Sequence, residues 1–110
     1  MSAIPRKTQQ VFGGGLTPAG NVANFGSLAA GTPTFSNDPA TIQTAAWLNG
    51  FAAALIGNRS PALEDLNGVF LTITQQIAYL LQNGVAEWDA GTTYWVGQIC
   101  RDVGTNQQYY

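Results

Sequence analysis

The chain has 110 residues, of which only 9% are charged, against about 25% in an average soluble domain. The net charge is −2 and basic residues do not cluster beyond Arg6 and Lys7, which argues against nucleic-acid binding. The absence of histidine and the single cysteine, Cys100, exclude histidine catalysis, histidine metal sites and an internal disulfide. So few charges favour a surface that meets other protein, with a neutral solvated surface as the alternative.

Residues 1–37 are rich in Gly, Ala, Pro, Thr and Asn, and no helical or strand period persists there. A disordered tail is one interpretation, but such tails are usually charged and poor in aromatic residues. The composition therefore predicts an extended arm, whose phenylalanines would dock on a neighbouring protein as anchors. These candidate anchors are Phe12, Phe25 and Phe35.

Two helices are expected over residues 38–84. In SNDP, Asp38 can cap and Pro39 can occupy the first helical position, which predicts a helix over about 39–57 that is apolar nearly all round. Ser60-Pro61 repeats the signal and predicts a second helix over 61–83, ending at Gly84. Because the connection is short, we expect an antiparallel helical hairpin.

The second predicted helix has an apolar seam with successive spacings of 3, 4, 3, 4 and 3 residues, which is a heptad pattern. Packing against the first helix alone would also produce such spacing. However, the hairpin has more apolar surface than it can cover by itself, and isoleucine at both kinds of seam position favours three or more strands. We therefore expect a homotrimeric bundle. The seam residues are Leu63, Leu66, Phe70, Ile73, Ile77 and Leu80.

Residues 85–110 are expected to form a small β-module. Alternation over 98–103, a turn at 104–106 and a return over 107–110 predict two short strands. Glu87 and Asp89 resemble a catalytic carboxylate pair only in spacing, and Asp89 is better explained as a turn residue. The chain as a whole shows no catalytic, metal or cofactor constellation, so we expect a non-enzymatic protein without cofactors.

The aromatic pattern W-D-x-x-T-T-Y-x-x-G-x-I, followed by Q-Q-Y-Y, resembles the small chitin-binding carbohydrate modules. The matching positions are Trp88, Tyr94, Gly97, Ile99, and Tyr109 or Tyr110. The resemblance implies glycan binding through exposed aromatic residues, with Trp95 as the residue to test. The competing interpretation makes Trp88 and Tyr94 packing residues at the junction between the helices and a β-shaft.

A longer resemblance covers residues 10–103. The segments FGSLAAGTPTFSNDPATIQ, AAWLNGFAAALIGNRSPALEDLNGVF and QQIAYLLQNGVAEWDAGTTYWVGQIC resemble the N-terminal region of tailed-bacteriophage tail fibre proteins. The resemblance implies a structural virion protein: residues 1–37 would anchor it to tail or baseplate proteins, 38–84 would trimerise, and 85–110 would begin the fibre shaft for host adhesion. It also implies location in the virion tail, after synthesis in the host cytoplasm.

Neither a signal peptide nor a membrane-spanning segment is expected. Arg6-Lys7 is followed by polar and glycine residues rather than an apolar run. The most apolar stretch, AAWLNGFAAALIG, is too short to span a bilayer and contains Asn49 and Gly50.

Overall fold

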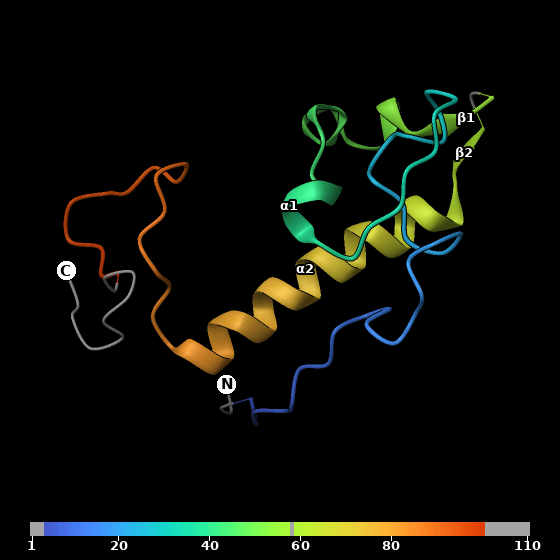
Figure 1. Cartoon of the computed structure of the whole chain (residues 1–110). Helices are drawn as coiled ribbons and strands as arrows, with labels where there is room; N and C mark the ends of the chain where they lie inside the picture. The colour runs from blue at the N-terminus through green and yellow to red at the C-terminus, as the bar shows by residue number, and fades with distance from the viewer. Residues whose placement is uncertain (1–3, 58, 101–110) are drawn as a thin grey trace. The chain divides into compact units, whose positions relative to one another are not determined.

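The computed structural model describes residues 4–57 and 59–100. The chain divides after Ala78 into two compact units, each described by itself. The protein is a small mixed α/β chain with one long helix and a two-stranded antiparallel sheet (Figure 1). Its elements are α1 (Pro39–Ile42), the 3₁₀ helix η1 (Ala45–Ala53), β1 (Leu55–Ile56), β2 (Ser60–Pro61) and α2 (Leu63–Asn83).

The long helix α2 lies close to the range 61–83 that the sequence predicts. It carries Glu64 and Asp65 in its first turn, where negative charge meets the positive end of the helix dipole. It ends at Asn83, and the next residue, Gly84, has φ +76° and donates from its backbone N–H to the Leu80 carbonyl at 2.7 Å. A left-handed glycine just past the last helical residue is a common helix terminator.

The single helix predicted over 39–57 is wrong. Asp38 does cap α1 by accepting from the Ala40 N–H at 3.1 Å, but α1 ends at Ile42. Thr44 is extended, and its hydroxyl donates to the Phe25 carbonyl at 2.6 Å, so a contact distant in sequence holds the backbone outside the helical region. The chain then continues as η1, which Gly50 interrupts with φ +61°.

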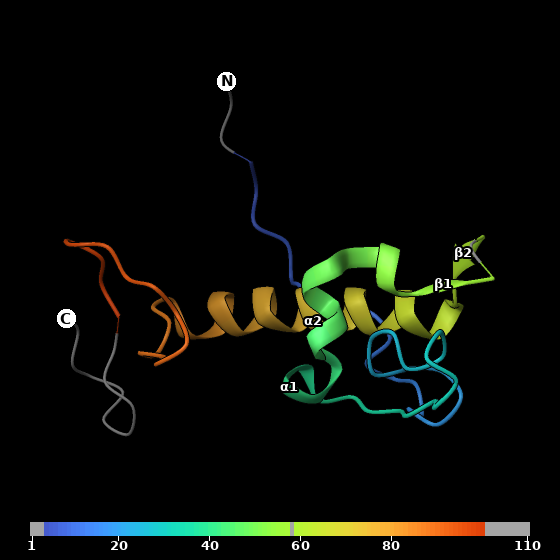
Figure 2. The ribbon, with the colours of Figure 1, turned by 90° about the horizontal axis from the view of Figure 1, so that it is seen from above.

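A tight β-hairpin, rather than the loop of a helical hairpin, precedes α2. Strands β1 and β2 pair antiparallel, with Leu55 opposite Pro61 and Ile56 opposite Ser60. The sequence predicts Pro61 in the first turn of the second helix, and this is wrong: Pro61 lies in strand β2. Figure 2 shows α1, η1 and the turn-rich N-terminal segment gathered around the first half of α2.

The N-terminal segment supplies much of the core of the first unit, in contrast to the projecting arm expected over 1–37. Val22 is fully buried and clusters with Ile42 and Leu71, with Val11 and Trp47 packed against them. Backbone hydrogen bonds fix this segment in place. They join the Ala23 N–H to Glu64 O, the Phe25 N–H to Ile42 O, and the Ser36 N–H to Val22 O, at 3.0–3.1 Å.

The second unit is described as far as Cys100 and consists of the end of α2 followed by turns. The hydroxyl of Tyr94 accepts from the Asp89 N–H at 2.7 Å, and Asp89 accepts from the Thr92 hydroxyl at 2.7 Å. Asp89 is thus a turn residue, as expected. The strands predicted at 98–103 and 107–110 fall largely outside the described residues, as do Tyr109 and Tyr110.

Candidate functional site

Two opposite faces of helix α2 differ in burial: one is buried in the chain's own core, and the other is partly exposed. The inner face carries the buried residues Asp65, Gly68, Leu71 and Thr72. At about 100° per residue, the predicted seam lies on the opposite side of the helix. Four of its six residues are two-fifths to half exposed, Leu63 is more exposed, and Leu66 is half-buried. We call this exposed seam the α2 stripe: Leu63, Leu66, Phe70, Ile73, Ile77 and Leu80.

The heptad register explains how both faces coexist. With Phe70 and Ile77 at a positions, and Ile73 at a d position, the core residues Leu71 and Thr72 fall at b and c. In a coiled coil, a and d face the partner helices, whereas b, c and f face away from them. The chain's own core therefore packs on the inner face, which would face away from partner helices in a coiled coil, and the coiled-coil seam stays partly exposed.

The α2 stripe carries no charge. From Leu66 to Ala86 the sequence contains no Asp, Glu, Lys or Arg. Identical helices can therefore lie parallel and in register without like-charge repulsion. Gln76, at a g position beside the stripe, has an amide that contains both a donor and an acceptor, so it adds polarity to the flank without charge.

Phe12 lies against one flank of the α2 stripe. Its ring is 5.3 Å from that of Phe70, measured between centroids, and its backbone N–H donates to the Thr74 hydroxyl at 2.8 Å. The ring is still 52% exposed. The chain thus holds Phe12 on the helix while presenting much of its apolar surface outward.

The three predicted anchors do not form one surface. Phe12 lies on α2, whereas Phe25 is only 3% exposed and has little ring surface to offer a partner. Phe35 is 38% exposed and forms an isolated β-bridge with Ala23. The sequence alone does not distinguish the buried phenylalanine from the exposed ones, because their local compositions are alike.

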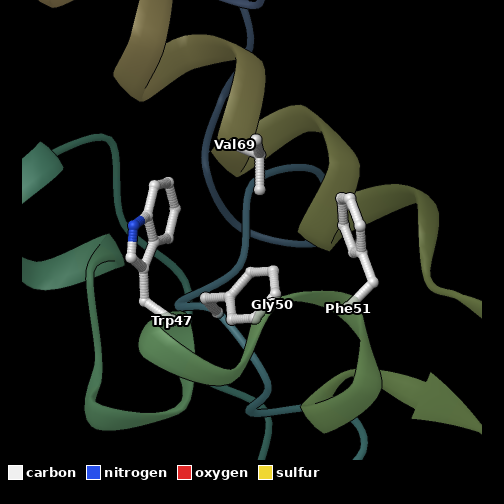
Figure 3. A pocket seen from close by; sticks show the side chains of 5 residues that line it. Trp47, Gly50, Phe51 and Val69 are labelled. Atoms are coloured by element: carbon white, nitrogen blue, oxygen red, sulfur yellow. The ribbon is translucent and has the colours of Figure 1, made fainter.

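An aromatic pocket of about 210 Å³ opens beside the other flank of the α2 stripe; it is lined by Phe25, Trp47, Gly50, Phe51 and Val69. Val69 points from α2 into the space between Trp47 and Phe51 (Figure 3). Phe25 forms the base, with its ring 5.5 Å from Trp47 edge-on and 5.7 Å from Phe51. Sequence reasoning missed this pocket because it required the break in the helix; the dipeptide Asn49-Gly50 was the available signal.

Asp65 is an unusual member of the inner face because its carboxyl is fully buried. Burial raises the pKa of Asp65, a hydrogen bond from the Gly26 N–H at 3.3 Å lowers it, and neighbouring Glu64 raises it again. The second carboxyl oxygen, Oδ2, has no hydrogen-bond partner among the described residues. Because Asp65 lies on the inner face, its burial affects the stability of the folded chain and not the properties of the α2 stripe.

The aromatic residues of the second unit are largely exposed. Trp95 is 75% exposed and Trp88 is 54% exposed, whereas Tyr94 is half-buried and hydrogen-bonded as described above. The role expected for Tyr94, packing at a junction between helices and a β-shaft, stays a prediction. Trp88 does not pack within its own chain to the extent that its expected role requires.

Neither a metal site nor a membrane span emerges from residues 4–57 and 59–100. They contain no group of three or more Cys, Asp or Glu residues able to hold a metal ion, and none of their helices has the length and apolar character that a bilayer crossing requires. No family model, curated protein or solved structure matches the chain. The functional argument therefore depends on the α2 stripe, its two flanks and the exposed aromatic residues.

Proposed function

We propose that this chain is a structural virion protein, the trimeric N-terminal base of a phage tail fibre, which attaches the fibre to tail or baseplate proteins. The observation that carries the trimer is the α2 stripe, an uncharged heptad seam exposed on the face opposite the chain's own core. The assignment to a tail fibre is supported by the resemblance of residues 10–103. The low proportion of charged residues, which favours a surface that contacts other protein, also supports it.

Self-association gives the α2 stripe the burial that it lacks in one chain. Full burial of a large aliphatic or aromatic side chain contributes about 1.5–3 kcal/mol, and most stripe residues are already about half-buried. In a trimer, the exposed parts of the stripe residues of all three chains would be buried, and this burial would stabilise the assembly relative to three separate chains. Isoleucine at both Ile73 (d) and Ile77 (a) favours three strands over two.

A trimer also explains how a short module would attach a fibre. Three parallel helices place three copies of the N-terminal segment on one assembly, so that binding of one copy raises the effective concentration of the others. Phe25 is buried in the core and Phe12 lies on α2, so we propose residues 4–10 as the anchor in place of the predicted phenylalanines; Ile4 in this range is 85% exposed. Tail or baseplate proteins are the proposed partners of this segment.

Sedimentation equilibrium tests the trimer directly. We expect a trimer mass for the wild type and a monomer for Ile73→Asp, because three carboxylates would meet at the seam. Gln82→Asp is the matched control, since it adds the same charge to an exposed position outside the stripe. A wild-type monomer at high concentration contradicts the proposal.

Attachment is tested separately, with the full-length fibre and its particle. Deletion of residues 1–8 is expected to leave the trimer intact and to prevent fibre incorporation in electron micrographs. A deletion of 1–35 is unsuitable, because it removes Val22 and Ala23 from the core. Normal fibres on particles that carry the short deletion would contradict the anchoring role.

Carbohydrate binding is a second candidate, favoured by the exposure of Trp95 and Trp88. Exposed aromatic faces are the surfaces on which sugar rings stack. A glycan array probed with the wild-type chain and with Trp95→Ala distinguishes the two functions. Binding that is lost on substitution would favour the carbohydrate module, whereas no binding leaves the structural role.

A further inference from the structure

The two flanks of the α2 stripe carry complementary features. Val69, which lines the aromatic pocket, immediately precedes the a position Phe70 and is therefore a g position. Thr74, which holds the backbone of Phe12, immediately follows the d position Ile73 and is therefore an e position. One flank thus offers a hollow and the other offers a projecting ring.

In a parallel bundle these flanks meet. Each g position of one helix lies beside the next e position of its neighbour, which is why charged pairs at these positions set partner choice in coiled coils. The e position that follows Val69 is Thr74. In the trimer proposed above, the pocket of one protomer would therefore face the Phe12 segment of the next protomer at the same height along the axis.

We propose that the aromatic pocket receives Phe12 of the neighbouring protomer. The pocket volume of about 210 Å³ exceeds the roughly 150 Å³ of an apolar cavity that accommodates benzene. The lining residues carry no charge, and the rings of Trp47 and Phe51 offer edge and face contacts to another aromatic ring. Phe12 is held in position by its own chain yet half exposed, so little ordering is needed before it binds.

The occupant is a second copy of this chain because ring and hollow lie on opposite flanks of one helix. Such a contact is heterologous, and a three-fold rotation closes it into a ring in which every pocket is filled. The inference rests on the proposed trimer and extends it: the N-terminal segment would contribute to the subunit interface.

Cross-linking of the full chain tests this contact. In a Cys100→Ser background, Phe12→Cys combined with Val69→Cys should form disulfide-linked dimers and trimers under mild oxidation. Either cysteine substitution alone is the control for cross-linking by a single thiol. Bonds formed only within single chains, or no bonds in a preparation that sediments as a trimer, would overturn the Phe12 contact and leave the trimer standing. A monomeric preparation would overturn both.

Affinity gives an independent readout that introduces no cysteine. Phe12→Ala should raise the trimer dissociation constant about tenfold or more, as truncation of a central interface aromatic commonly does. Phe35→Ala is the matched control, because Phe35 is a partly exposed phenylalanine of the same segment and is neither a stripe residue nor one of the residues that line the pocket. Equal dissociation constants for the two variants would contradict the proposal.

Discussion

Gly68 and Ala23 lie so close together that the chain allows no side chain at position 68: a Cβ there would lie 2.8 Å from the Ala23 carbonyl oxygen and 3.3 Å from Ile42 Cγ2. Glycine in the middle of a helix usually costs stability. Here it lets the N-terminal segment cross directly over α2, with its Ala23 N–H bonded to Glu64 O at 3.1 Å. This approach makes residues 22–25 part of the core.

Gly68→Ala is therefore expected to lower the free energy of unfolding by about 1–3 kcal/mol, as overpacking commonly does, despite a gain of about 1 kcal/mol in helix propensity. Urea denaturation at a fixed protein concentration measures the change. Gln76→Ala, at an exposed position of the same helix, is the control and should be nearly neutral. A Gly68→Ala protein more stable than the wild type would show that the close approach is absent.

The sequence predicts α2 and its stripe well because their signals are local. The acidic first turn, the 3-4 spacing and Gly84 all lie within the helix or next to it. The break between α1 and η1 is not local: Thr44 bonds to the carbonyl of Phe25, nineteen positions earlier in the chain. Propensity over 39–57 favours one helix, and tertiary contacts override it.

The same reason limits prediction of the site. The α2 stripe could be read from spacing, but the aromatic pocket requires Phe25, Trp47 and Val69 to meet from separate segments. No periodic pattern marks residues 22–25 as core, because this stretch pairs through single hydrogen bonds and an isolated bridge.

Thr44→Val tests the bond that ends the helix. Loss of the hydroxyl leaves the partly buried Phe25 carbonyl without this donor, so the free energy of unfolding should fall by about 1–2 kcal/mol. Thermal denaturation followed by circular dichroism measures the loss. Thr32→Val, at an exposed position, is the control and should have little effect. Equal stability of both variants would indicate that the hydroxyl contributes nothing.

Asp65→Asn tests the buried carboxyl. Because burial raises the pKa of Asp65 in the folded state, its contribution to stability is fully present below the unfolded pKa near 3.8 and is lost as pH rises through the folded pKa. Asparagine keeps an oxygen for the Gly26 N–H but does not ionise. As pH increases from about 3 to about 7, the free energy of unfolding of the variant should rise relative to that of the wild type.

Urea titrations at several pH values provide that measurement. Asp89→Asn, which alters an exposed carboxylate, is the control and should not reproduce the gain. If the difference in stability between Asp65→Asn and wild type does not change with pH, the carboxyl does not titrate with a raised pKa.

Salt dependence distinguishes an apolar seam from an electrostatic one. Since residues 66–86 contain no charged side chain, the wild-type trimer should keep its dissociation constant within about threefold between roughly 0.05 and 0.5 M salt. Ile77→Lys would place three ammonium groups near the axis, and its weakened association should recover partly as salt screens them. Ile77→Gln removes the same apolar contact without adding charge, so the weakening of association in this variant should not depend on salt. Strong weakening of the wild type by salt would mean that charges elsewhere in the chain, and not the α2 stripe, hold the copies together.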